Sequence, residues 1–105
     1  IYKMIVNIER SPVRHKRYRV TMDNGKTYDF GLDGGSTYID HFDTTKRYHY
    51  WLRHLANPTE NRLINNLVPS PSLFSAFLLW GDSNDLFTNI KTLNNLWKKK
   101  HSKNI

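Results

Sequence analysis

The chain has no cysteine among its 105 residues. Without a thiol it can form no disulfide framework, zinc-thiolate site or cysteine nucleophile, which suits a reducing compartment. It also has no apolar run close to the ~20 residues that cross a bilayer, and Ile1-Tyr2-Lys3-Met4 lacks the basic-then-apolar order of a secretory signal. These absences predict a soluble protein. Because residue 1 is Ile rather than Met, the sequence leaves N-terminal targeting open.

Motifs of catalysis and metal binding are missing as well. His49 and His54 are five residues apart, which places them on different faces of a helix, and no histidine has HExxH or Cys/His spacing. No serine lies in a G-x-S-x-G turn. Asp29-Phe30-Gly31 spells a kinase tripeptide, but the other kinase elements do not fit in this chain, so we interpret it as a strand end. We therefore expect no enzyme activity, no metal site and no cofactor.

Positive charge is concentrated at the two ends of the sequence, within a net charge of +7. Residues 1–22 hold six basic residues against one acidic residue, and residues 95–105 hold four lysines and no acid. The residues between them hold six basic and eight acidic side chains. This distribution favours two basic arms that bind an acidic partner. The candidate partner-binding or nucleic-acid-binding residues are Arg10, Arg14, Lys16, Arg17, Arg19, Lys98, Lys99, Lys100 and Lys103.

Residues 1–31 alternate apolar and polar side chains with a period of two, which predicts an antiparallel β-meander. Asp23-Asn24-Gly25 indicates a hairpin turn, because Asn and Gly accept positive backbone φ angles. Lys26–Phe30 is then the return strand. The basic segment 10–17 is expected to be a mobile, solvent-exposed loop. The residues expected on one face of the three strands are Tyr2, Met4, Val6 and Ile8, then Tyr18, Val20 and Met22, then Tyr28 and Phe30.

Residues 38–100 have helical apolar spacing and are expected to form three to four helices, followed by a basic tail at 101–105. The expected start signals are Asp43 for a helix to about Ala56, Thr59 for a short second helix, Ser70-Pro71 for an apolar helix that Gly81 ends, and Ser83 for the last helix. The expected core residues outside the apolar segment 73–80 are Tyr48, Trp51, Leu52, Leu55, Leu63, Ile64, Leu67, Leu86, Ile90, Leu93 and Trp97. A small sheet followed by helices predicts an α+β fold, here as one domain over residues 1–105.

Two blocks between residues 41 and 80 could form a site: His41-x-Asp43 through Tyr50-x-x-Arg53-His54, and Ser75-x-x-Leu78-Leu79-Trp80. Arg53 and His54 are typical of a phosphate-binding or acid-binding site. With Asp43 or Glu60 nearby, they are also typical of an ion-paired network that ties the helix to the hairpin, and we favour this structural interpretation. The structural signature consists of His41, Asp43, Tyr50, Arg53, His54, Leu78, Leu79 and Trp80.

These blocks also carry a likeness to known proteins. The residues that carry it are Tyr38–Asp43, Lys46-Arg47, Tyr50, Arg53-His54, Phe74-Ser75 and Leu78-Leu79-Trp80, with the pairs Gly25-Lys26 and Phe30-Gly31. Over residues 18–97 the chain resembles a family of small uncharacterised basic proteins of large double-stranded DNA viruses, of the mimivirus, chlorella virus and iridovirus type. Family members commonly have an aromatic or basic residue where Ala76-Phe77 stands, and a Lys-Pro pair in place of Gly81-Asp82. The resemblance implies a viral protein packaged in the virion, present in the host cytoplasm during assembly, and it implies no catalytic residue.

Two functional hypotheses follow. The first is a non-enzymatic minor capsid or cement protein that bridges larger capsid proteins through their acidic surfaces. The alternative is a non-specific nucleic-acid-binding protein of the viral genome, with the basic ends on phosphates and Tyr18, Tyr28 and Phe30 stacking on bases. In either case an edge of the apolar segment 73–80 could remain exposed as a protein interface.

Overall fold

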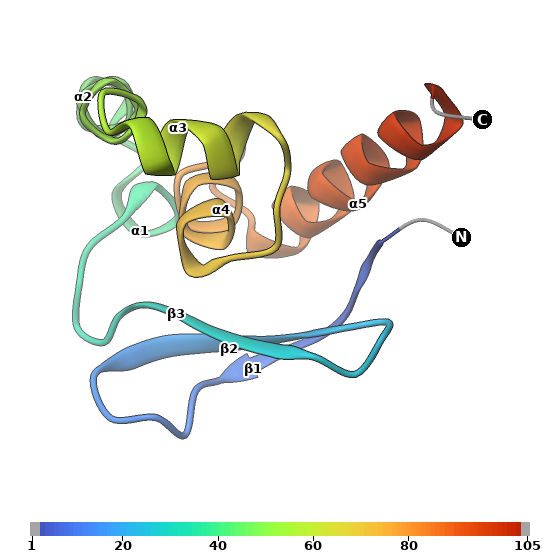
Figure 1. The fold of residues 1–105 in the computed structure, drawn as a ribbon. Coiled ribbons are helices and arrows are strands. Elements are labelled where there is room, and N and C mark those ends of the chain that lie inside the picture. Colours follow the sequence, from blue (N-terminus) through green and yellow to red (C-terminus); the bar gives the residue numbers. More distant parts are fainter. Residues whose placement is uncertain (1–2, 104–105) are drawn as a thin grey trace.

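A three-stranded antiparallel sheet and a layer of helices on one of its faces make up the molecule (Figure 1). The computed structural model describes the backbone of residues 3–103 and the side chains of residues 3–101. The strands are β1 (Ile5–Arg10), β2 (Lys16–Met22) and β3 (Thr27–Leu32), in the order β1-β2-β3. The helices are α1 (Tyr38–His41), α2 (Thr44–Leu55), α3 (Pro58–Asn65), α4 (Pro71–Phe74), the π-helical turn η1 (Ser75–Leu79) and α5 (Leu86–Lys103). The predicted α+β order is confirmed.

The β2–β3 hairpin turns where Asn24 and Gly25 predicted it. The Met22 amide donates to the Lys26 carbonyl at 2.9 Å, and the side chain of Asn24 accepts from the Lys26 amide at 3.0 Å. Gly25 has a φ of +85°, a conformation that costs glycine little because it has no Cβ. The loop between β1 and β2 is shorter than expected: Arg10 ends β1, and Lys16 already begins β2.

The face assignment of the first strand is confirmed for Ile8 and wrong for the residues before it. Ile5 pairs with Met22 and Asn7 with Thr21, so β1 has one extra residue between these two pairs. This β-bulge leaves Val6 57% exposed and turns Ile5 toward the core instead of Met4 and Val6, while Ile8 packs against the core as predicted. The expected inward position of Tyr2 lies outside the described residues.

The core forms where the inner face of the sheet meets α4, η1 and α5. Phe74 lies at its centre, with its ring centroid 5.7 Å from that of Phe30, 5.4 Å from that of Tyr28 and 6.3 Å from that of Trp97. The buried core residues of this layer are Ile5, Val20, Met22, Phe30, Leu73, Phe74, Leu78, Leu79, Leu93 and Trp97.

Two hypotheses about exposed apolar residues do not agree with this packing. Most of segment 73–79 is buried, and Phe77 is partly buried against the core, so it offers no free apolar edge. The helices also cover the sheet face that carries Tyr18, Tyr28 and Phe30, which prevents these rings from stacking on bases. A third prediction is also wrong. Tyr48 and Leu52 of α2, which were expected in the core, are large apolar side chains exposed to solvent.

The helix caps agree with the sequence in two cases and differ in others. Asp43 caps α2, and Ser70 caps α4, as predicted. Asn57 caps α3 with its side chain, rather than only ending the preceding helix. The side chain of Asp85, not that of Ser83, accepts from the Thr88 amide at the start of α5. Thr37 begins the unexpected helix α1.

The last helix is longer than expected. α5 continues to Lys103, so residues 101–103 are helical and not a tail, while 104 and 105 lie outside the described residues. In the described part of the chain no helix is long and apolar enough to span a membrane.

Candidate functional site

The two signature blocks meet at the indole ring of Trp80. The ring of Tyr50 stacks on this indole, with a centroid distance of 4.5 Å and an interplanar angle of 6°. On the ring of Tyr50, in turn, lies the imidazole of His54, with a centroid distance of 4.1 Å. The imidazole of His41 packs edge-on against Trp80 at 5.3 Å, while its Nδ1 accepts from the Asp43 amide at 2.9 Å. Asp43 itself caps α2 and does not join the Tyr50 cluster. The two blocks are therefore linked by aromatic contacts at Trp80. Of the expected ion pairs, His54 with Glu60 forms, but it joins α2 to α3 and not to the hairpin.

Side chains of α2 also donate hydrogen bonds to the backbone at Trp80. Trp51 Nε1 donates to the Trp80 carbonyl at 2.9 Å. Arg47 Nε donates to the carbonyls of Trp80 and Gly81 at 3.1 and 2.9 Å, and its guanidinium pairs with Asp82 at 2.8 Å. Carbonyls at the end of a helix lack intrahelical partners, and these donors satisfy them.

A π-helical turn and a glycine shape the chain at Trp80. The Trp80 amide donates to the Ser75 carbonyl five residues earlier, at 3.1 Å. Gly81 is buried, and a Cβ added to it would lie 2.2 Å from the Phe77 carbonyl oxygen. Buried Asn89 holds the next loop: its Nδ2 donates to Leu78 and Ser83 carbonyls, and its Oδ1 accepts from the Ser83 amide. π-turns of this kind occur frequently beside functional sites.

A cleft of about 670 Å³ opens beside this aromatic cluster, and we call it the Tyr50 cleft. It lies between the helices α2, α3 and α4 and the end of the β2–β3 pair that is opposite the Asn24-Gly25 turn. Signature residues that line it are Tyr50, Arg53, His54, Leu79 and Trp80, and the other charged or hydroxyl-bearing lining residues are His15, Lys16, Ser36, Thr37, Glu60, Ser72 and Ser75. Such a volume is typical of sites for small molecules.

The carboxylate of Glu60 is the acidic group that lines the cleft, and it is engaged within the protein. Its Oε2 lies 2.9 Å from His54 Nδ1, and its Oε1 accepts from Ser72 Oγ at 3.4 Å. This order differs from a nucleophilic triad, because the serine contacts the carboxylate and not the imidazole.

Tyr50 is a hydroxyl donor in this cleft. Burial raises the pKa of its phenol well above its ordinary value of 10, the negative charge of Glu60 adds to this rise, and Arg53 opposes it. The phenol therefore stays protonated at neutral pH. Lys16 and Arg53 are exposed, and within residues 3–101 neither side chain has a hydrogen bond or ion pair.

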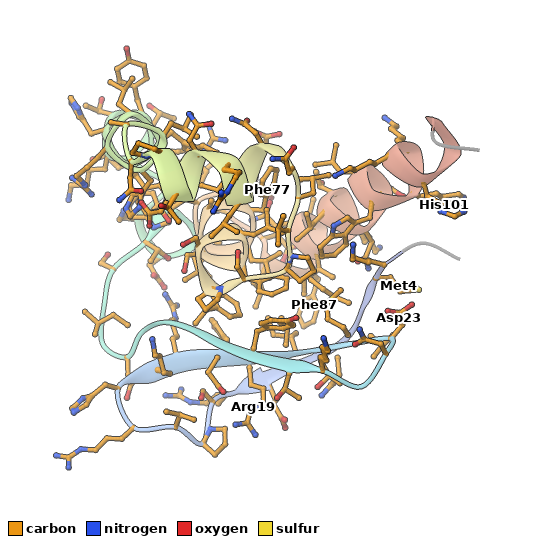
Figure 2. The ribbon with its side chains drawn as sticks, viewed as in Figure 1. Met4, Arg19, Asp23, Phe77, Phe87 and His101 are labelled. Carbon is orange, nitrogen blue, oxygen red and sulfur yellow. The ribbon has the colours of Figure 1, made fainter. Side chains whose placement is uncertain are left out.

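Two of the arginines proposed to bind a partner are paired inside the fold. Arg17 forms two hydrogen bonds with Asp40, at 2.7 and 2.8 Å, and Arg19 forms two with Asp29, at 3.0 and 3.1 Å. The Arg17 guanidinium, followed by the Thr37 amide and hydroxyl, holds the pKa of Asp40 far below its usual range. In Figure 2, Arg19 lies on the side of the sheet that faces away from the helices.

The other candidates at the N-terminal end are more exposed. Arg10 makes a longer contact of 3.6 Å with Asp33. Arg14 is exposed, and like Lys16 its side chain has no ion pair in the described part of the chain. Only part of the first basic end is therefore available to a partner.

The lysines at the other end lie on the last turns of α5 instead of after it. Lys98 and Lys99 are exposed, whereas Lys100 Nζ donates to the Asn66 carbonyl at 2.6 Å. The side chain of Lys103 lies outside the described residues. Figure 1 shows the β1–β2 turn and the C-terminal end of α5 at opposite ends of the molecule, so the two basic ends do not form one surface.

Sequence reasoning missed two features of this region. One is that Phe87, Lys91 and Asn95 share an exposed face of α5 with the predicted candidates Lys98 and Lys99; we call these five residues the outer face of α5. Their spacing of three and four residues was the available signal. The other is that Lys16 and Arg53 line the same cleft. A single sequence carries no signal for such a long-range arrangement. Among residues 3–101 no group of three or more His, Asp or Glu could hold a metal ion.

Comparison with known proteins gives one partial match. No curated protein and no solved structure matches the chain. A family model described as "Family of unknown function (DUF5754)" matches residues 6–54, which extend from β1 to the last turn of α2. The matched region contains Lys16, Tyr50, Arg53 and His54 of the Tyr50 cleft, but not Trp80 or α5. The chain is thus similar to a family of unknown function over somewhat less than half of its length.

Proposed function

We propose that this protein is a non-enzymatic minor capsid protein of a large DNA virus, which binds an acidic surface of a larger capsid protein through the outer face of α5. The observation that carries the proposal is this face itself. Lys91, Lys98 and Lys99 are exposed there, and α5 contains no acidic residue. The resemblance of the two signature blocks to viral proteins supports the location in a virion.

An apolar side chain on the same face favours a protein partner. Phe87 is 63% exposed at the start of α5, on the side of the helix that carries the three lysines. Figure 2 shows it at the opposite end of the helix from His101. Aromatic side chains are the usual energetic centre of protein interfaces, with charged residues at the rim.

Purified virus particles test this proposal. The protein is expected in the shell fraction, and the triple variant Lys91→Gln/Lys98→Gln/Lys99→Gln is expected to be depleted from it. A matched control removes the same charge from exposed residues elsewhere, as Lys26→Gln/Lys46→Gln/Arg62→Gln, and should be packaged normally. Absence of the wild-type protein from particles, or equal loss in both variants, would refute the proposal.

Nucleic-acid binding remains the second candidate, because the same three lysines could neutralise three phosphates. Its affinity would then fall with salt at a logarithmic slope of about −2.7, as expected for three released counterions. Co-purification with the DNA core at low salt and release at moderate salt would favour this candidate over the capsid proposal.

A further inference from the structure

We infer that the Tyr50 cleft is a binding site for a small phosphomonoester of nucleotide size. The inference is independent of the capsid proposal, because the cleft shares no residue with the outer face of α5. It rests on the charge, the hydrogen-bond donors and the dimensions of the cleft.

Charge is the first argument. Lys16 from the β1–β2 hairpin and Arg53 from α2 line the same cleft, and in the described part of the chain neither has an ion pair. By contrast, Arg17, Arg19 and Arg47 each pair with a carboxylate within the fold. The cleft thus offers two positive charges to a ligand. A phosphomonoester has a charge of about −1.5 to −2 at neutral pH, which matches them.

Glu60, the acidic residue among the described lining residues, is held by partners within the protein. Glu60 accepts from Ser72 and contacts His54 Nδ1, so its two oxygens already have partners. An anion in the cleft would meet Lys16 and Arg53, which have no ion pair among the described residues, while the Glu60 oxygens are engaged by Ser72 and His54.

Neutral donors complete the polar side of the cleft. Tyr50, Ser36 and Ser75, each with a hydroxyl group, line it from three different segments of the chain. Phosphate has three strong acceptor oxygens, and an arginine fork binds two of them in parallel. A carboxylate ligand would provide only two acceptor atoms for this larger set of donors.

The dimensions indicate a ligand larger than inorganic phosphate. A cleft of about 670 Å³ has room for an organic body beside the phosphate. Pro71, Leu79 and Trp80 supply apolar surface on the helical wall. A nucleoside monophosphate combines the two parts, and its base or sugar would lie against this wall.

Titration of the full chain followed by amide NMR shifts tests the inference. The probes are adenosine 5′-monophosphate, inorganic phosphate and adenosine, at low salt and pH 7. We expect the monophosphate and, more weakly, phosphate to shift the amides of residues 15–16, 36–37 and 50–54, with adenosine causing much smaller shifts. Shifts by adenosine equal to those by the monophosphate, or shifts confined to α5, would overturn the inference.

Variants make the test specific to the cleft. Arg53→Gln and Lys16→Gln should each weaken monophosphate binding about tenfold, the effect of losing one charge-assisted contact. Both side chains are exposed and unpaired in the described structure, so the thermal unfolding temperature should not change. Arg62→Gln removes an exposed arginine of α3 outside the cleft and should bind like the wild type. Unchanged affinity in Arg53→Gln would contradict the assignment.

Discussion

Substitution of Gly81 by alanine is expected to destabilise the protein through a steric clash that the structure locates. The new Cβ would lie 2.2 Å from the Phe77 carbonyl oxygen and 2.8 Å from Cγ and Oδ1 of Asn89. The first contact is with backbone, so the π-helical turn itself would have to shift. Overpacking of a buried site costs about 1–3 kcal/mol.

The second contact adds to this cost, because Asn89 cannot move freely. Its side chain makes two hydrogen bonds with Ser83, in the loop between η1 and α5, at 2.8 and 3.1 Å, and one with the Leu78 carbonyl of η1 at 3.0 Å. Losing one of them costs about 1 kcal/mol, which brings the expected total to about 3 kcal/mol. A domain of this size is stable by about 5–15 kcal/mol, so Gly81→Ala would remain folded but clearly weakened.

Urea unfolding followed by tryptophan fluorescence measures this effect. With a typical slope of about 2 kcal/mol per molar urea, the midpoint should fall by about 1.5 M. The control is Gly34→Ala, where no atom lies within 4 Å of the added Cβ and only the positive φ of +82° is unfavourable, at about 1 kcal/mol. If Gly81→Ala were no less stable than Gly34→Ala, the steric argument would be incorrect.

Three further predictions concern single side chains. Asp40→Asn should cost about 1–2 kcal/mol at pH 7 by weakening its hydrogen bonds with Arg17. Because the pKa of Asp40 is lower in the folded than in the unfolded state, the difference in urea midpoint between wild type and variant should shrink as the pH falls below about 4; a constant difference down to pH 2 would contradict this. Tyr50→Ala should lower the free energy of unfolding by about 3–4 kcal/mol, because the packing against Trp80 is lost. The matched control Tyr50→Phe should lower it by well under about 1 kcal/mol, and thermal unfolding measures both. Asn57→Ala should cost about 1 kcal/mol by removing the cap of α3, measured by urea unfolding, and a neutral result would show that water replaces the cap.

Features that depend on neighbouring residues in the sequence were predictable. The turn at Asn24-Gly25 and the caps at Asp43 and Ser70 each follow from the local chemistry of one or two side chains, and the structure confirms them. The helix α1 was missed although a local signal existed. Thr37 is followed three residues later by Asp40, which reproduces a capping box.

Features that depend on tertiary contacts were not predictable from this single sequence. The bulge between Ile5 and Asn7 reverses the face of the residues that precede it, and no residue type in that segment marks it. The core-facing assignment of Tyr48 was wrong because α2 packs against η1 and Trp80 through Tyr50, beside the correctly predicted Trp51. The residue type of Arg53 suggested a phosphate site, but the sequence did not show that Lys16 lines the same cleft.

The helices that cover the sheet lie outside the region that the family model matches. The matched region ends at residue 54, but the inner face of its strands is buried by segments between residues 73 and 97. Alone, the first half would leave Val20, Met22 and Phe30 in water, at a cost of roughly 2 kcal/mol each. The matched residues 6–54 therefore do not include the segments that bury the inner face of their own sheet.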